Sequence, residues 1–222
     1  MRPEALSRQT VSVSSDSVAV RDQTDEKTVH LFDSNTGKPL GDGRPYVHRQ
    51  EVVEVALEQT GPPHERKLAI IDKNRDLHLV TVRRLGSGSG KLGAMVASLR
   101  WSSDCSMLAA MQDSRFTLWY YPTIISVDRA LLNRWVMCYH AVLSSCLMTR
   151  TLVERDSAEF GKYPVITSFE NNSVSVRKGD GSLVTTGVSP YPAILHGYVT
   201  SQHWDDATKL CRFVKVNPGH SC

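Results

Sequence analysis

The chain has 222 residues, enough to bury one sizeable core, and carries a net charge of only +3. So small a charge does not predict binding to nucleic acid or to a membrane surface by bulk electrostatic attraction. The five cysteines are irregularly spaced and form no CxxC pair, which argues against a disulfide framework or a cysteine zinc site and indicates a reducing compartment.

No segment has the features of a targeting or membrane-spanning sequence. Residues 1–10 lack the apolar stretch of a signal peptide. Residues 135–148 are the most apolar stretch, but His140 interrupts them and they are shorter than the about 20 residues that a spanning helix needs. We therefore expect a cytosolic chain without membrane insertion.

Short apolar runs separated by tight turns predict β-strands over the first two-thirds of the chain. Near-continuous apolar runs are typical of strands that are buried on both faces, as in stacked sheets. The expected strands are 10–14, 17–21, 28–33, 51–57, 67–71, 77–82, 95–101, 107–111 and 115–121.

The strand pattern repeats along the chain. Runs that begin at Val29, Leu77 and Phe116 each follow another apolar run and a turn that contains aspartate. Their starts lie 48 and 39 residues apart, close to the roughly 40–45 residues of a four-stranded propeller blade. A later run at Val174 lies 58 residues beyond Phe116, and removing the dissimilar segment 133–150 brings that spacing to 40.

The pattern changes near residue 190, where a helical hairpin is predicted. Residues 193–198 are expected to form a short helix, and Ser201 to be the N-cap of a second. Apolar residues at helical spacing give this second helix one apolar face, which we expect to pack in the core. They are Trp204, Ala207, Leu210, Cys211 and Val214.

These elements predict an all-β fold, a partial propeller of about three to four blades, followed by a short C-terminal α-helical hairpin. The expected divisions are 1–132 for propeller blades, 133–150 for an atypical insertion, 151–189 for the last propeller strands, 190–215 for the hairpin that starts an α-solenoid, and 216–222 for a disordered tail.

Several motifs carry a resemblance to a known family. Phe32-Asp33 and the following turn 36–40 resemble the end of a WD40 blade, although no Gly-His pair and no Trp-Asp occurs. A closer resemblance, to the WD40-repeat subunits of intraflagellar transport complex B, covers most of the chain. It rests on residues 71–77, 116–122, 154–156, 190–196 and 204–215, whereas 133–150 and 216–222 have no counterpart in that family.

The resemblance implies a second propeller joined to the start of a helical region, in a non-enzymatic scaffold that acts through protein–protein interaction. It implies other complex B proteins as partners, with self-association possible, and no nucleic acid, membrane insertion or cofactor. It places the protein in the cytoplasm and the cilium, at the basal body and axoneme. A vesicle-coat subunit of similar build is an alternative that only its partners would distinguish.

A second alternative is a nucleotide-binding enzyme built on the glycine-rich loop 86–93. Gly88, Gly90 and Gly93 match the spacing of a dinucleotide fingerprint. Such a fingerprint needs a helix that opens at the loop, whereas the next residues predict a strand. A Gly-Ser connection is therefore the simpler interpretation.

Other candidate sites have simpler structural explanations. Asp72, Asn74 and Asp76 resemble the start of a calcium loop, but Leu77 occupies the required glycine position, which favours a capped β-turn. Cys138, His140 and Cys146 fit no standard zinc spacing and lack a fourth ligand. The charged residues Glu154, Arg155, Asp156 and Glu159 are interpreted as a solvated connection rather than as an acid–base pair.

We therefore expect no catalytic, cofactor or metal residues, and four candidate partner-binding residues. Trp204 and Leu210 belong to the apolar face of the second helix, where the alternative role is core packing. Arg83 and Arg84 form a small basic patch with Lys91, where the alternative is a solvated loop.

Overall fold

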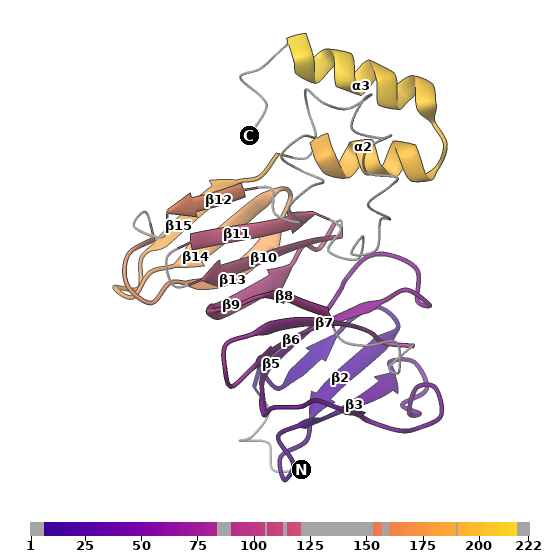
Figure 1. Ribbon diagram of the computed structural model, residues 1–222, viewed down its shortest axis with the longest axis vertical. Coiled ribbons are helices and arrows are strands. Elements are labelled where there is room, and N and C mark those ends of the chain that lie inside the picture. Colours follow the sequence, from indigo (N-terminus) through magenta and orange to yellow (C-terminus); the bar gives the residue numbers. More distant parts are fainter. Residues whose placement is uncertain are drawn as a thin grey trace.

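The computed structural model describes residues 7–83, 90–104, 106–112, 115–120, 153–156, 160–189 and 191–216. These residues form four antiparallel sheets in series, followed by two helices. Figure 1 shows the sheets side by side, with the helices stacked beyond the third and fourth of them.

The first two sheets are four-stranded meanders, in which each strand pairs with the next along the chain. Tight turns between strands keep the pairing local, and Asp22, Asp33 and Asp72 hold three of these turns with side-chain hydrogen bonds. The first meander contains β1 (Val11–Val13), β2 (Ser17–Arg21), β3 (Thr28–Asp33) and β4 (Tyr46–Val47); the second contains β5 (Val52–Leu57), β6 (Lys67–Asp72), β7 (Leu77–Thr81) and β8 (Gly90–Gly93).

The third meander has four strands and the fourth has three. In the fourth meander, Asn171 and Asn172 form the turn between the first two strands, and both adopt the left-handed conformation that asparagine tolerates. The third contains β9 (Val96–Trp101), β10 (Met107–Gln112), β11 (Arg115–Tyr120) and β12 (Val153–Asp156); the fourth contains β13 (Val165–Glu170), β14 (Ser173–Arg177) and β15 (Leu183–Gly187).

The first strands of successive meanders pack against one another: β1 against β5, β5 against β9, and β9 against β13. The N-terminal segment returns to the fourth meander, because Arg8 Nη2 donates a hydrogen bond to the Thr167 carbonyl oxygen at 2.6 Å. Meanders that adjoin through their first strands form a partial β-propeller, as the sequence predicted.

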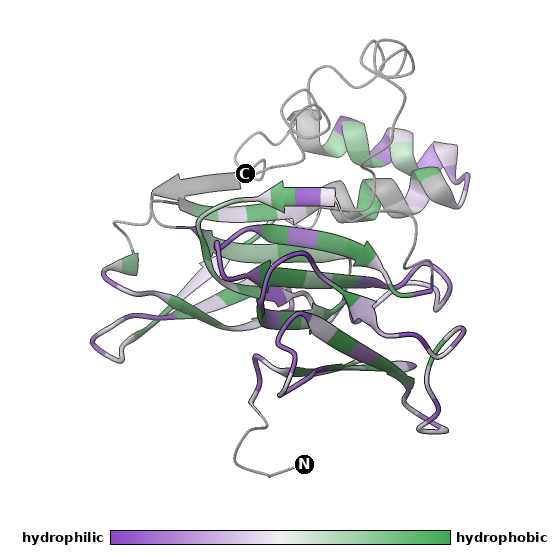
Figure 2. Cartoon of the chain, turned by 60° about the horizontal axis from the view of Figure 1, so that its bottom comes forward, coloured by the Kyte–Doolittle hydropathy of each residue, from purple (hydrophilic) through white to green (hydrophobic). Residues whose placement is uncertain are grey.

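Apolar side chains fill the space between neighbouring sheets. Figure 2 shows green segments along the strands and much purple in the turns that connect them. One cluster joins the first and second meanders, another joins the second and third, and another the third and fourth. Trp119 and Phe116 on β11 are among the largest fully buried side chains and belong to different clusters, so this strand is buried on both faces as expected.

The structure corrects several local predictions. The strands β4 and β8 were not expected, and Glu154, Arg155 and Asp156 lie in β12, paired with β11, rather than in a solvated connection. Backbone hydrogen bonds hold these strands, and such bonds do not require an apolar sequence. The predicted insertion at 133–150 lies outside the described residues, and so does 217–222.

The two helices are α2 (Tyr191–Thr200), which is longer than the sequence indicated, and α3 (Trp204–Val216), which begins later than predicted and ends one residue beyond the predicted hairpin. They pack against each other. Within the described part of the chain, neither helix combines the length and apolar character needed to cross a lipid bilayer.

Candidate interaction surface

The turn between the two helices differs from the prediction in one respect. Ser201 does not cap α3: its backbone N–H and its hydroxyl both donate to the Gly197 carbonyl oxygen, at 3.0 and 2.6 Å, so that it closes the end of α2. Gln202 adopts a positive φ of 61°, which is typical of a residue just past a helix end. The N-cap of α3 is His203, whose carbonyl oxygen accepts the Ala207 N–H at 3.0 Å.

The predicted apolar face of α3 is only partly buried. Ala207 is buried, whereas Leu210 and Cys211 are half-buried. Trp204 is 50% exposed, so the expectation that it packs in the core is wrong. At about 100° per residue, Ala207 lies at the centre of the face, with Trp204 about 60° to one side of it and Phe213 about 120° to the other.

Aromatic side chains therefore flank the buried centre of the hairpin. Phe213 is 47% exposed and contacts the ring of Tyr191 on α2, with centroids 6.0 Å apart. Ile194 on α2 is exposed as well, whereas Leu195 beside it is buried. The hairpin thus presents large apolar groups to solvent beside its buried residues, and exposed apolar groups that lie together suit protein binding.

The basic patch is separate from the hairpin in the chain. Arg83 follows β7 in the second meander and is exposed. Its charge acts on Asp33 of the first meander, whose pKa lies below its ordinary value chiefly because the Thr36 amide and hydroxyl donate to it, with Arg83 a weaker contributor. Arg84 lies outside the described residues. Trp204 and Leu210 share α3, and no contact described here joins them to Arg83.

The glycine-rich segment does not have the structure that a dinucleotide site requires. Gly90 and Gly93 lie in β8, which pairs antiparallel with β7, and the strand β9 follows instead of a helix. Lys91 forms an ion pair with Asp76 at 2.6 Å. A Cβ atom at Gly93 would lie 3.3 Å from the Trp119 ring, so this glycine permits close packing between two meanders.

The aspartate-rich turn is the capped β-turn that the sequence favoured. Asp72 Oδ1 accepts the backbone N–H groups of Asn74 and Asp76 at 2.8 and 3.0 Å. Arg75 between them has a positive φ of 63°. Because the carboxylate already accepts these two bonds, the turn is explained without a calcium ion.

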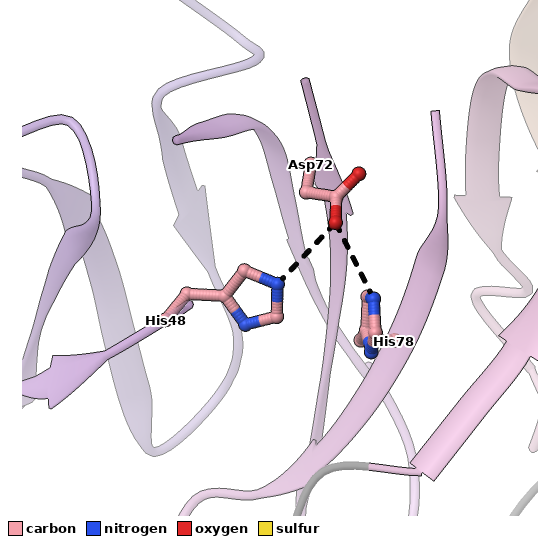
Figure 3. A group of neighbouring side chains, drawn as sticks. All are labelled: His48, Asp72 and His78. Atoms are coloured by element: carbon pink, nitrogen blue, oxygen red, sulfur yellow. Dashed lines mark ion pairs between the residues drawn. The ribbon is translucent and has the colours of Figure 1, made fainter. Parts of the chain in front are cut away.

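The other oxygen of Asp72 faces two histidines, as Figure 3 shows. Asp72 Oδ2 lies 3.6 Å from His48 Nε2 and 3.5 Å from His78 Nε2. Burial of His48, together with the nearby His78, lowers the pKa of the His48 imidazole despite the opposing effect of Asp72. The sequence analysis missed this cluster; its three other candidate metal ligands, Cys138, His140 and Cys146, lie outside the described residues.

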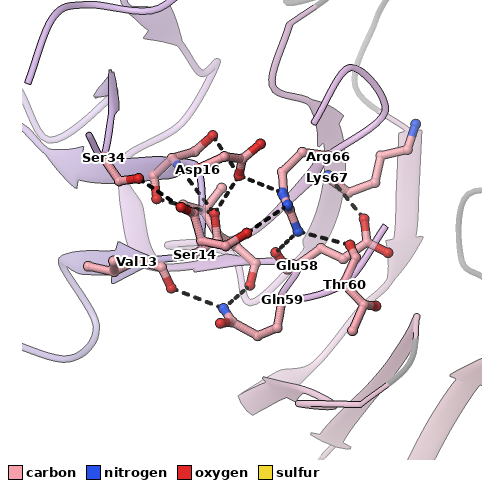
Figure 4. A network of polar contacts seen from close by, with 12 residues as sticks. Val13, Ser14, Asp16, Ser34, Glu58, Gln59, Thr60, Arg66 and Lys67 are labelled. Carbon is pink, nitrogen blue, oxygen red and sulfur yellow. Dashed lines mark hydrogen bonds and ion pairs between the residues drawn. The ribbon is translucent and has the colours of Figure 1, made fainter. Parts of the chain in front are cut away.

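A polar network joins the first three meanders, as Figure 4 shows in part. Arg66 Nε donates to Asp16 Oδ1 at 2.9 Å, and its Nη1 donates to the carbonyl oxygens of Glu58 and Thr60, each at 2.9 Å. The Glu58 carboxylate accepts a hydrogen bond from Ser106 of the third meander. The network therefore fixes the relative positions of three neighbouring sheets.

A second charged group lies between the first strands of the meanders. Arg100 on β9 donates to Glu54 on β5 at 3.1 Å. Burial raises the pKa of Glu54 and lowers that of Arg100, and each charge partly offsets the effect on the other. Glu54 interrupts an otherwise apolar strand, which is the one sequence signal that could have indicated a buried polar contact.

The fold and this surface define the class: a β-propeller protein with an attached helical hairpin, whose exposed features suit contact with other macromolecules. The chain belongs to the family described as the IFT80 second beta-propeller, whose model matches residues 1–142 and 132–191. The matched residues cover the four meanders and end at the first residue of α2.

Individual relatives agree with the family. The chain is 48% identical over 224 residues to the intraflagellar transport protein 80 homolog of Rattus norvegicus, and 47% identical to that of Mus musculus. In both comparisons all of this chain is aligned, but it spans only 27% of the relative.

Among solved structures, the computationally designed Ika4 protein resembles the chain in fold alone. The TM-score is 0.50 and the identity 14%, with 85% of this chain and 95% of that one covered.

Proposed function

We propose that the chain is part of a non-enzymatic scaffold of intraflagellar transport, and that it acts by binding other proteins of complex B. The observation that carries the proposal is the 48% identity along the whole chain to an intraflagellar transport protein 80 homolog. We further propose that the protein works in the cytoplasm and cilium, at the basal body and axoneme.

The geometry supports a binding role. Three sheets are held together by the buried Arg66 network, which provides a stable frame for exposed side chains. The hairpin beyond this frame exposes Trp204 and Phe213. Binding energy in protein interfaces concentrates in a few aromatic and arginine side chains, so Trp204 and Arg83 are the anchors we propose, together with Leu210 and Arg84.

The division of the chain follows from the same proposal. Residues 1–132 and 151–189 would supply propeller blades, 190–215 the start of an α-solenoid, 133–150 an inserted segment and 216–222 a disordered tail. The proposal includes self-association of the chain, which would give the transport assembly more than one copy of these binding surfaces.

The test is co-purification from ciliated cells of the tagged chain, with complex B subunits quantified by mass spectrometry. We expect the wild-type chain to recover these subunits and Trp204→Ala to lower their recovery severalfold. Tyr163→Ala, which removes an exposed aromatic from the fourth meander, is the matched control and should leave recovery unchanged. A well-expressed chain that recovers no complex B subunit would refute the proposal.

A further inference from the structure

One side chain from the end of the first meander and two from the second converge on one point. His48 directly follows β4, Asp72 ends β6, and His78 is in β7. One ligand atom from each lies within 4.8 Å of the other two. We propose that His48, Asp72 and His78 form a binding site for a divalent cation of the zinc class.

The distances favour an ion between these atoms over direct hydrogen bonds. The separations of 3.6 and 3.5 Å between Asp72 Oδ2 and the two Nε2 atoms exceed the about 2.7–3.2 Å of N–H···O hydrogen bonds. A tetrahedral ion with bonds of about 2.0–2.2 Å holds its ligand atoms about 3.3–3.6 Å apart. The two carboxylate–imidazole separations therefore fit such an ion, and all three ligand atoms lie within 4.8 Å of one another.

Neighbouring groups orient two of the ligands. The Tyr46 hydroxyl lies 3.0 Å from His48 Nδ1, so the ring's other nitrogen, Nε2, is the one that faces Asp72. Asp72 Oδ1 is held by the backbone of its own turn, which directs Oδ2 toward the histidines. Outer contacts of this kind fix metal ligands in known sites.

Burial and access also suit a metal site. The side chains of His48 and Asp72 are 2% and 3% exposed, whereas that of His78 is 16% exposed and offers a route for the ion. His78 Nδ1, the nitrogen that faces away from Asp72, is buried without a hydrogen-bond partner among the described residues, so only its Nε2 is engaged with the other two side chains. Imidazole binds a metal ion in its neutral form, so two histidines and one carboxylate would hold a dication with one carboxylate charge beside it.

The first meander contains a matched pair that lacks the third ligand. His30 pairs with Val20, two residues before Asp22, and His78 pairs with Ile70, two residues before Asp72. The first pair is hydrogen-bonded at 3.0 Å and more exposed. A histidine and an aspartate thus occupy equivalent positions in the two meanders. In the first meander they form a hydrogen bond, whereas in the second His48 joins them in a group of three ligands with wider spacing.

The test measures Zn²⁺ bound by the 222-residue chain, with its thiols alkylated so that cysteine does not compete. Zinc content after dialysis and the melting temperature with and without Zn²⁺ are compared for wild type, His48→Gln, His78→Gln and Asp72→Asn. The asparagine variant keeps an oxygen that can accept the two turn hydrogen bonds, and His30→Gln is the matched control.

We expect wild type and His30→Gln to bind one equivalent of zinc and to melt at a higher temperature with it. Each of the other variants should lose that equivalent and the zinc-dependent shift. Cobalt substituted for zinc should give the visible absorption of a tetrahedral site in wild type, and in a variant only if that variant also binds zinc. Absence of zinc binding by wild type, or binding by His48→Gln and His78→Gln equal to that of wild type, would overturn the proposal.

Discussion

Arg66 is nearly inaccessible to solvent, yet it carries a full charge that must be satisfied inside the protein. Its guanidinium bonds to Asp16 and Ser15 of the first meander and to two carbonyl oxygens of the second. Each of these contacts fixes one sheet relative to the next. Arg66 thus makes hydrogen bonds between two sheets that an apolar side chain of similar size could not make.

Replacing Arg66 by methionine should lower the free energy of unfolding by about 2–4 kcal/mol, because it leaves the Asp16 charge and two carbonyl oxygens without their partner. Urea unfolding followed by tryptophan fluorescence measures the change. Arg44→Met is the control, because the Arg44–Asp42 pair is exposed and should contribute less than about 1 kcal/mol. Equal losses in the two variants would contradict the role of the network.

Glu58 supplies a pH test of the same network. Burial raises the pKa of its carboxyl group, although the Ser106 hydroxyl and the Lys67 amide act in the opposite direction. A carboxyl with a raised pKa in the folded state binds its proton more tightly there than in the unfolded chain. Its favourable contribution is therefore complete below the ordinary value of 4.5 and is lost as the pH rises through the raised value.

The stability of wild type relative to Glu58→Gln should therefore fall as the pH rises from about 4.5 toward 7. Unfolding free energies of both proteins at several pH values give this difference. Glu170→Gln, at the exposed end of β13, controls for the general effect of the substitution. A difference that rises over this interval would show that Glu58 is stabilised in its charged form.

At the scale of single elements, the turn after β14 depends on a close backbone approach. The Gly179 N–H donates to the Lys162 carbonyl oxygen at 3.0 Å, and a Cβ atom at Gly179 would lie only 2.5 Å from that oxygen. Gly179→Ala should destabilise the protein by about 1–3 kcal/mol, since backbone must move to admit the methyl group.

Gly187→Ala is the matched control for this substitution, because a Cβ atom there would meet nothing within 4 Å. We expect its effect to stay within about 0.5 kcal/mol. Thermal unfolding gives the melting temperatures of both variants. Equal values would mean that the turn accommodates the methyl group at Gly179 without loss of stability, contrary to this prediction.

Local pattern was enough to predict most strands of this chain. Strands β2 and β3 have the predicted bounds, because alternating apolar residues and an aspartate turn define them within a few neighbours. β8 and β12 were missed, since backbone pairing holds a glycine-rich and a charged segment equally well. Ser201 was assigned to the wrong helix, because a hydroxyl at a helix–helix turn can bond to either end.

The candidate sites were less predictable, because they depend on pairs that are distant in sequence. Arg66 and Asp16 are 50 residues apart, and His48, at the end of the first meander, meets His78 only when the first two sheets lie side by side. Trp204 follows helical periodicity, but its exposure depends on where α2 packs. Periodicity indicates which face is apolar, whereas tertiary packing decides how much of that face is buried.

At the scale of the whole molecule, the fourth meander differs from the others. In the described residues it ends at β15, where the other meanders have a fourth strand, and Leu183 on β15 is exposed. An uncovered sheet edge favours pairing with another chain. Light scattering after size-exclusion chromatography should show association that increases with concentration.

Leu183→Lys should reduce this association, because a charge on an edge strand opposes pairing. Tyr163→Lys adds the same charge at an exposed position outside the strands and is the control. A monodisperse wild-type monomer at every concentration would contradict an associating edge.

The central structural claim is that successive meanders fan around a common axis, so that the first and fourth approach each other there. Arg8 and Thr167 touch across this gap although 159 residues separate them. In a cysteine-free background, Arg8→Cys with Thr167→Cys should be joined within one chain by a short bismaleimide, at a rate independent of protein concentration. The control pair, Arg8→Cys with Leu183→Cys, lies two strands farther out, by about 9–10 Å, and should not be joined.

Efficient intramolecular cross-linking of the first pair alone is the result that the account predicts. Cross-links that form only between chains, or equally in both pairs, would contradict a propeller arrangement of the four sheets.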